Sequence, residues 1–117
     1  MPDQKILDAF AMMWGLFPEP VMLIQKDRTI LAVNQQASQM GISAGIRCST
    51  LNQECEPGQS CKHCQANLAL NSQQAVMKQS AKDGACILGY WVPVEGHAGL
   101  YVHFGIGMAK PLTLLTE

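Results

Sequence analysis

Apolar residues near the N-terminus recur three and four positions apart, which is the spacing of one helix face. This pattern consists of Ile6, Leu7, Phe10, Met13, Trp14 and Phe17. Pro18 and Pro20 end it, because a proline disfavours helical conformations in the residue before it. The stripe is wider than one face of an isolated surface helix needs. We therefore predict an N-terminal helix within residues 1–17 that is buried on more than one side.

Short apolar runs bounded by turn residues predict strands in the rest of the chain. They cover residues 21–25, 29–33, 75–81, 86–94 and 100–108. A polar turn at 26–28 joins the first two runs into a hairpin. Asp83 and Gly84, a strong hairpin signal, join the third run to the fourth. The last turn is expected at residues 95–99.

Two shorter helices are predicted between the two groups of strands. Asn34 is a favourable N-cap for a helix over residues 35–40, and another helix is expected over 64–70. Residues 47–60 show no clear periodicity. Antiparallel strands joined by short turns, with helices inserted between two strand groups, predict one α+β domain.

The element order is accompanied by four distinctive segments. These are Leu7-Asp8-Ala9-Phe10 with Phe17-Pro18-Glu19-Pro20-Val21, the hairpin from Ile24 to Asn34, the stretch from Ala69 to Val76, and the stretch from Gly99 to Ile106. In this order and in these segments the chain resembles the PAS family over about residues 5–108. The resemblance implies a five-stranded antiparallel sheet of order 2-1-5-4-3, with helices over one face enclosing a ligand pocket.

The resemblance also implies a function in signal transduction. The expected protein is a sensor that binds a small ligand, cofactor or metal and regulates an effector domain or protein, such as a kinase, a cyclase or a transcription regulator. Residues 1–17 are then an N-terminal helix for dimerisation or for capping the sheet. Residues 18–108 form the PAS-like sensory domain, and 109–117 are a tail or linker.

Length and charge narrow the alternatives. The 117 residues suit one domain, and a net charge of −1 without basic runs argues against nucleic-acid binding. No apolar stretch approaches the roughly 20 residues that span a bilayer, and the N-terminal segment lacks the flanks of a signal peptide. We therefore expect a cytoplasmic protein with no membrane partner. No catalytic motif is present, so an enzyme is not expected.

Four of the five cysteines lie close together in the sequence. They are Cys48, Cys55, Cys61 and Cys64. Four converging thiolates bind zinc or an iron–sulfur cluster, and zinc is the more frequent tetrahedral case. We predict a metal site here. Because a second Cys-x-x-Cys pair is missing, a redox dithiol and inert thiols stay open as alternatives.

Some bacterial PAS domains of signalling proteins carry a similar Gly-x-x-Cys followed by Cys-x-x-Cys, here Gly45 to Cys48 and Cys61 to Cys64. The competing function is a small thiol redox or electron-transfer protein built on Cys61 and Cys64. His63 is expected to be solvated, and Cys86 to be a small core residue.

Alternation in the last strand places His103 and Phe104 on opposite faces. If Phe104 points to the core, His103 lies on the outer face. There a hydrogen-bonded His under a docked helix is favoured over a haem ligand or proton acceptor. Tyr90 and Trp91 are likewise expected on opposite faces.

The width of the N-terminal apolar stripe predicts a homodimer, with a second subunit covering the part of the helix that one sheet does not cover. In the monomeric alternative, the helix folds across its own sheet and covers Tyr101 and His103.

Overall fold

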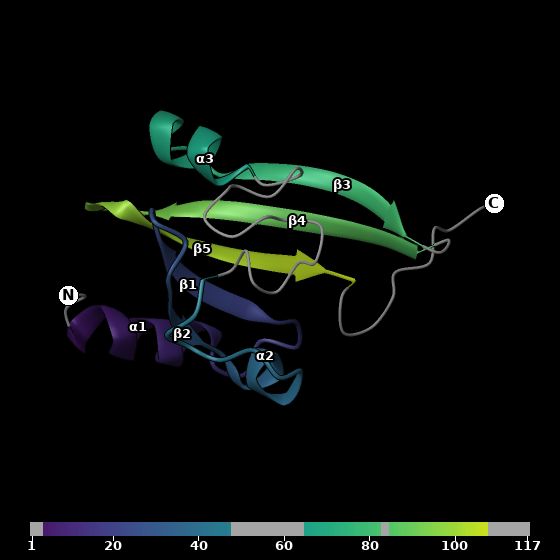
Figure 1. The fold of residues 1–117 in the computed structure, drawn as a ribbon, viewed down its shortest axis with the longest axis horizontal. Helices are drawn as coiled ribbons and strands as arrows, with labels where there is room; N and C mark the ends of the chain where they lie inside the picture. Colours follow the sequence, from purple (N-terminus) through teal and green to yellow (C-terminus); the bar gives the residue numbers. More distant parts are fainter. Residues whose placement is uncertain (1–3, 48–64, 83–84, 108–117) are drawn as a thin grey trace.

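The strands form one five-stranded antiparallel sheet, which confirms the predicted α+β class. The computed structural model describes residues 4–47, 65–82 and 85–107. The elements are α1 (Gln4–Trp14), β1 (Val21–Gln25), β2 (Ile30–Val33), α2 (Gln35–Gln39), α3 (Ala66–Ser72), β3 (Val76–Lys82), β4 (Ala85–Val94) and β5 (His97–Ile106). The sheet order is β2-β1-β5-β4-β3 (Figure 1), as the resemblance implied.

The first and last strands of the sequence, β1 and β5, pair with each other inside the sheet. Val21 lies opposite Phe104, and Leu23 lies opposite Val102. On its other side β5 pairs with β4. Because β1 and β5 have a neighbouring strand on each side and helices above and below, Val21 is fully buried.

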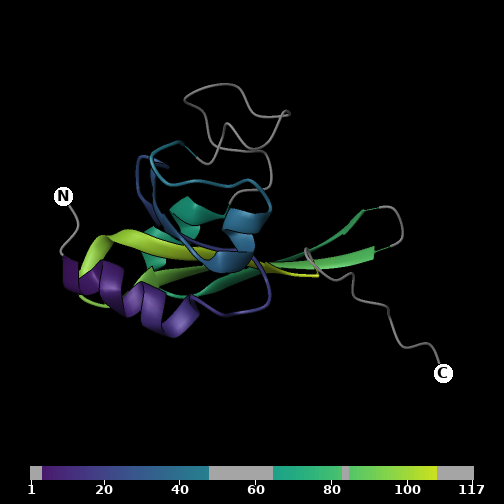
Figure 2. The same ribbon diagram turned by 90° about the horizontal axis from the view of Figure 1, so that it is seen from below.

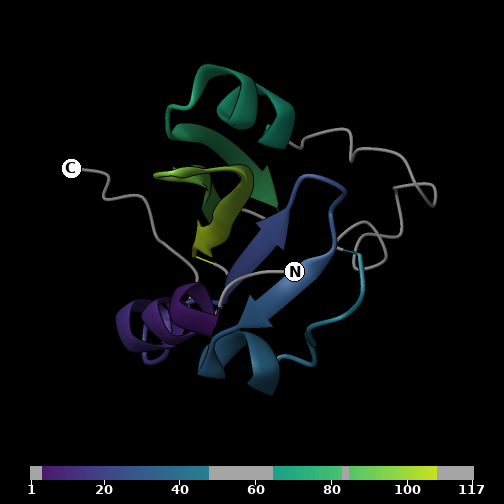
Figure 3. The same ribbon diagram turned by 90° about the vertical axis from the view of Figure 1, so that its left-hand side faces the viewer.

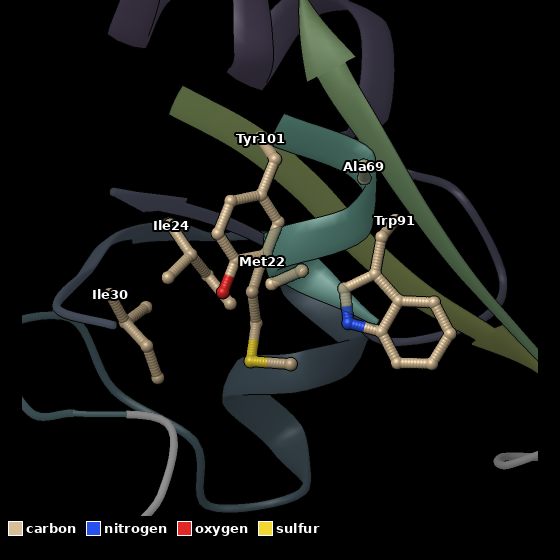
Figure 4. Close-up of a cluster of buried hydrophobic side chains, with 7 residues drawn as sticks. Met22, Ile24, Ile30, Ala69, Trp91 and Tyr101 are labelled. Atoms are coloured by element: carbon tan, nitrogen blue, oxygen red, sulfur yellow. The ribbon is translucent and has the colours of Figure 1, made fainter. Parts of the chain in front are cut away.

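Helices cover both faces of the sheet (Figure 2). α1 lies on one face, while α2 and α3 lie on the other. α3 is near the β3 edge, and α2 is near the β2 edge (Figures 1 and 3). The core on the α3 face consists of Met22, Ile24, Ile30, Ala66, Ala69, Trp91 and Tyr101 (Figure 4). The two alanines of α3 are small, which lets this helix approach the sheet closely.

A second core lies between α1 and the opposite face. Its buried residues are Phe10, Val21, Leu23 and Val102. Partly buried residues around them include Ile6, Leu7, Trp14, Phe17 and Phe104. α1 therefore lies across its own sheet, but it covers Val102 and Phe104 rather than Tyr101 and His103. The expectation for the monomer named the wrong set of residues, because alternation directs Tyr101 towards α3.

Most predicted elements are confirmed, with shifted ends. α1 ends at Trp14, before the predicted limit at Phe17. β5 begins at His97, because the turn is shorter than the predicted 95–99. Gly96 has φ +80°, a conformation that favours glycine, and it allows Val94 to pair with His97. Asn34 caps α2 as predicted, since its side chain accepts a hydrogen bond from the Ala37 amide.

In the part of the chain that the structure describes, no helix is long and apolar enough to cross a membrane.

Candidate functional site

His103 is a partly buried imidazole on the α3 face of the sheet. Its Nδ1 lies 2.9 Å from the carbonyl oxygen of Tyr90. Because a carbonyl only accepts hydrogen bonds, Nδ1 carries the proton and Nε2 of the neutral ring is an acceptor. Burial lowers the pKa of His103 by disfavouring the imidazolium, and the Tyr90 hydrogen bond opposes this only in part. The site therefore holds a neutral histidine at pH 7.

Trp91 of β4 lies directly opposite His103, and the two rings stack with centroids 4.7 Å apart and an interplanar angle of 21°. The other end of the indole lies over Gly89, where an added Cβ would come within 3.1 Å of the Trp91 Cη2 atom. Glycine at this position therefore makes room for the indole. The nitrogen-bearing edge of Trp91 faces Met22 (Figure 4).

The placement of His103 differs from the expectation of an outer face. Phe104 does pack into a core, but this core is the one under α1. His103 consequently points to the face that carries α3. The opposite orientation of Tyr90 and Trp91 is confirmed, since Tyr90 stacks on Phe104 at 5.0 Å while Trp91 belongs to the α3 core.

Arg28 connects the β1–β2 turn to this region. Its guanidinium donates to the carbonyl oxygen of Lys26 at 2.6 Å and to Oδ1 of Asn67 in α3 at 2.8 Å. It lies 5.9 Å from the centroid of the Tyr101 ring, within range of a cation–π interaction. The side chain is buried, although its backbone has φ +76° as part of the turn. A buried cation therefore lies at the margin of the α3 core.

Sequence reasoning missed the roles of Arg28 and Gly89. Arg28 contacts a residue 39 positions away, and no local pattern indicates such a contact. Gly89 did carry a usable signal, because an isolated glycine inside a strand often marks a close approach of another group.

Cys48, Cys55, Cys61 and Cys64 lie outside the described residues, as does His63. The metal site and the thiol redox function therefore stay predictions. The side chain of Cys86 is also outside the description. Within residues 4–47, 65–82 and 85–107, no group of three or more His, Cys, Asp or Glu side chains is arranged to hold a metal ion.

The surface of α1 and of the residues after it carries large exposed apolar side chains. Met12, Met13 and Leu16 are 79%, 70% and 87% exposed. Of the apolar stripe, Met13 thus faces outward, while Phe10 and the other members pack on the sheet. An exposed apolar cluster of this kind is typical of an interaction surface.

The fold is similar to several solved signalling domains. A sensory box sensor histidine kinase from Vibrio cholerae aligns with a TM-score of 0.64 and 14% identity, over 94% of this chain and 92% of that chain. A domain of an HTR-like protein from Haloarcula marismortui aligns at 0.59 and 19% identity, over 82% and 99%. The PAS domain of Bordetella pertussis BvgS aligns at 0.55 and 13% identity, over 96% and 88%.

No family model matches the sequence, and no curated protein matches it. The structural similarity, together with the sheet order, shows that the chain has the PAS fold. The fold that the four sequence segments implied is therefore confirmed.

Proposed function

We propose that this chain is a PAS-type sensory module of a cytoplasmic signalling system, which binds a small molecule on the α3 face of its sheet and regulates an effector without catalysing a reaction. The observation that carries the proposal is the stacking of His103 on Trp91, a residue of the α3 core. The hydrogen bond to Tyr90 occupies only Nδ1 of His103, so Nε2 is the atom proposed to meet a ligand. Nearby, the cation of Arg28 lies at the edge of the same core.

The chemistry of these groups suggests the kind of ligand. Flat aromatic surfaces favour a planar ligand, since offset stacking adds to the gain from apolar burial. Nε2 of His103 accepts a hydrogen bond in the neutral ring, so a ligand with an N–H or O–H donor is favoured. The adaptable side chain of Met22 lies beside them and accommodates ligands of different outline.

Trp91 offers a direct test, because the chain has only two tryptophans and Trp14 lies on the other face. The variant Trp14→Phe leaves Trp91 as the single reporter. The full chain is purified, examined by native mass spectrometry and absorbance, and extracted with organic solvent. Adding the extract back should change the Trp91 emission. The matched variant Trp91→Phe, which reports from Trp14, should respond much less.

The proposal of a ligand site is wrong if native and denatured masses agree and neither this extract nor a small-molecule extract of the expressing cells alters Trp91 emission. A response of Trp14 alone would place binding on the other face.

The regulated effector is proposed to be a kinase, cyclase or transcription regulator, either attached to this chain or separate from it. This part of the proposal is supported by similarity to a domain of a sensor histidine kinase. It is tested by co-purification of the chain with candidate effectors, with and without the extract described above. A candidate whose activity the chain does not change, either with or without the extract, is not the effector of this module.

We also propose that the chain forms a homodimer through the exposed part of α1 and Leu16, two residues after its end. Support comes from Met12, Met13 and Leu16, which are too exposed and too apolar for an isolated surface. The double variant Met13→Glu with Leu16→Glu should be monomeric by analytical ultracentrifugation. Leu68→Glu is the matched control, because Leu68 is 54% exposed on α3, across the sheet. A monomeric wild type at high micromolar concentration contradicts the dimer.

A further inference from the structure

Glu19, in the connection between α1 and β1, is a buried carboxylate with a distant partner. It is 8% exposed, and its Oε2 accepts a hydrogen bond of 3.1 Å from the backbone amide of Gly107. Gly107 is the first residue after β5, so this contact joins positions 88 residues apart. A buried carboxylate requires such partners, because desolvation without them is costly. We call this pair the Glu19–Gly107 contact.

The side chain of Asn34 forms hydrogen bonds with both the backbone of Glu19 and the end of α1. Its Nδ2 lies 2.9 Å from the Glu19 carbonyl oxygen and 3.1 Å from the Trp14 carbonyl oxygen. Its Oδ1 accepts from the Val21 amide at 2.9 Å. Asn34 is itself buried. Displacement of the end of α1 therefore strains the hydrogen bonds that position Glu19.

Aromatic contacts add a second connection between α1 and the end of β5. The rings of Trp14 and Phe17 have their centroids 5.2 Å and 5.8 Å from that of Phe104. Phe104 lies three residues before Gly107. The end of β5 is thus covered by the rings of Trp14 and Phe17, and the residue after it is bound by the Glu19 carboxylate.

Gly107 is also where the backbone direction changes after β5. Its φ of +98° lies in a region that favours glycine, so the amide that Glu19 binds belongs to a residue with unusual conformational freedom. Loss of the Glu19–Gly107 contact would release this residue to other conformations. The backbone conformation at the end of β5 would then change.

We propose that the Glu19–Gly107 contact couples the docking of α1 to the conformation of the chain where it leaves β5. An event that undocks α1, such as a partner binding the apolar residues that α1 otherwise packs on the sheet, withdraws Glu19 and releases Gly107. Coupling of this kind is reciprocal, so release of Gly107 also loosens α1. This regulation goes beyond the sensory role proposed above and does not depend on a ligand on the α3 face.

The test is amide hydrogen exchange at single-residue resolution by NMR on the full chain. Phe10→Ala weakens the docking of α1 without removing a contact of Gly107, since Phe10 packs in the α1 core. We expect Gly107 to exchange about tenfold faster or more, which is the scale for losing a hydrogen bond to a charged group. The amides of β3 provide the reference, and an equal acceleration there would mean global unfolding, which overturns the proposal. If Phe10→Ala does not fold, Leu7→Ala, at a partly buried position, takes its place.

The reverse experiment uses Glu19→Ala, which should accelerate exchange in α1 relative to β3. Glu19→Gln keeps an acceptor oxygen and should have a smaller effect. Glu95→Ala is the matched control, because Glu95 is exposed in the β4–β5 turn, and it should change neither region. The proposal is overturned if Phe10→Ala leaves Gly107 unchanged, or if Glu19→Ala accelerates Gly107 but not α1.

Discussion

Replacing Asn34 by alanine tests how much one buried polar side chain contributes to the fold. Its Oδ1 accepts hydrogen bonds from the amides of Val21 and Ala37, at 2.9 Å and 3.0 Å. Its Nδ2 lies within 3.2 Å of three backbone carbonyl oxygens, those of Trp14, Phe17 and Glu19. The side chain therefore joins α1, the following connection, β1 and α2.

The expected loss follows from the groups left behind. A buried donor or acceptor without a partner costs about 1–3 kcal/mol, and removal of an N-cap costs about 1 kcal/mol. The cavity that alanine leaves allows a water molecule to satisfy part of this demand. We expect Asn34→Ala to lower the free energy of unfolding by about 3–5 kcal/mol. That is a large fraction of the total stability of about 5–15 kcal/mol that is typical of domains.

Urea unfolding followed by circular dichroism measures this difference. Asn71→Ala is the matched control, because Asn71 is exposed on α3, and it should change the free energy by less than about 0.5 kcal/mol. Asn34→Asp keeps the cap for Ala37 but faces the three carbonyl oxygens with a negative charge, so it should also be destabilising. A loss below about 1 kcal/mol for Asn34→Ala would show that these hydrogen bonds do not determine the packing of α1, contrary to the reasoning.

Three further predictions concern the α3 face and the cysteines. The lowered pKa of His103 means that the unfolded chain, with a His pKa near 6.5, binds more protons at acidic pH. The contribution of His103 to the free energy of unfolding should therefore be fully present above pH 6.5 and decrease as the pH drops below it. His103→Gln should reduce this dependence on pH in urea titrations from pH 7 to pH 5. An identical slope in both proteins would mean that His103 is not buried in its neutral form. Gly89→Val should cost about 1–3 kcal/mol and alter Trp91 emission, because its side chain would overlap the indole, and an unchanged spectrum argues against the stacking. If a structural metal is bound, chelation or the double change Cys61→Ser with Cys64→Ser should lower stability by several kcal/mol, and a melting temperature unaffected by complete chelation would contradict the site.

Local patterns predicted most elements because the turns are marked by particular residues. The apolar run at 21–25 coincides with β1, and the cap at Asn34 precedes α2 as expected. The turn before β5 was predicted too long, because two glycines lie in residues 95–99 and only Gly96 makes the turn. The sheet order came from the resemblance to a family and not from periodicity.

The orientation of His103 was not predictable from alternation alone. Alternation separates two faces, but both faces of this sheet are covered, so Phe104 and Tyr101 are each packed in a core. An apolar residue then does not identify the side that carries α3. The contact of Arg28 with Asn67 depends on how the turn and the helix are brought together, which only the tertiary structure determines.

The pairing of β1 with β5 has a consequence for biosynthesis. Val21 and Phe104 are neighbours in the sheet, yet more than two thirds of the chain separates them in sequence. While the ribosome is still making the C-terminal third, the β1–β2 hairpin has no strand to pair with on its inner edge. Contacts between distant segments slow folding, and an exposed strand edge invites association with other chains. We therefore expect the sheet to be completed only after β5 has been synthesised, and a chain truncated before β5 to aggregate rather than fold.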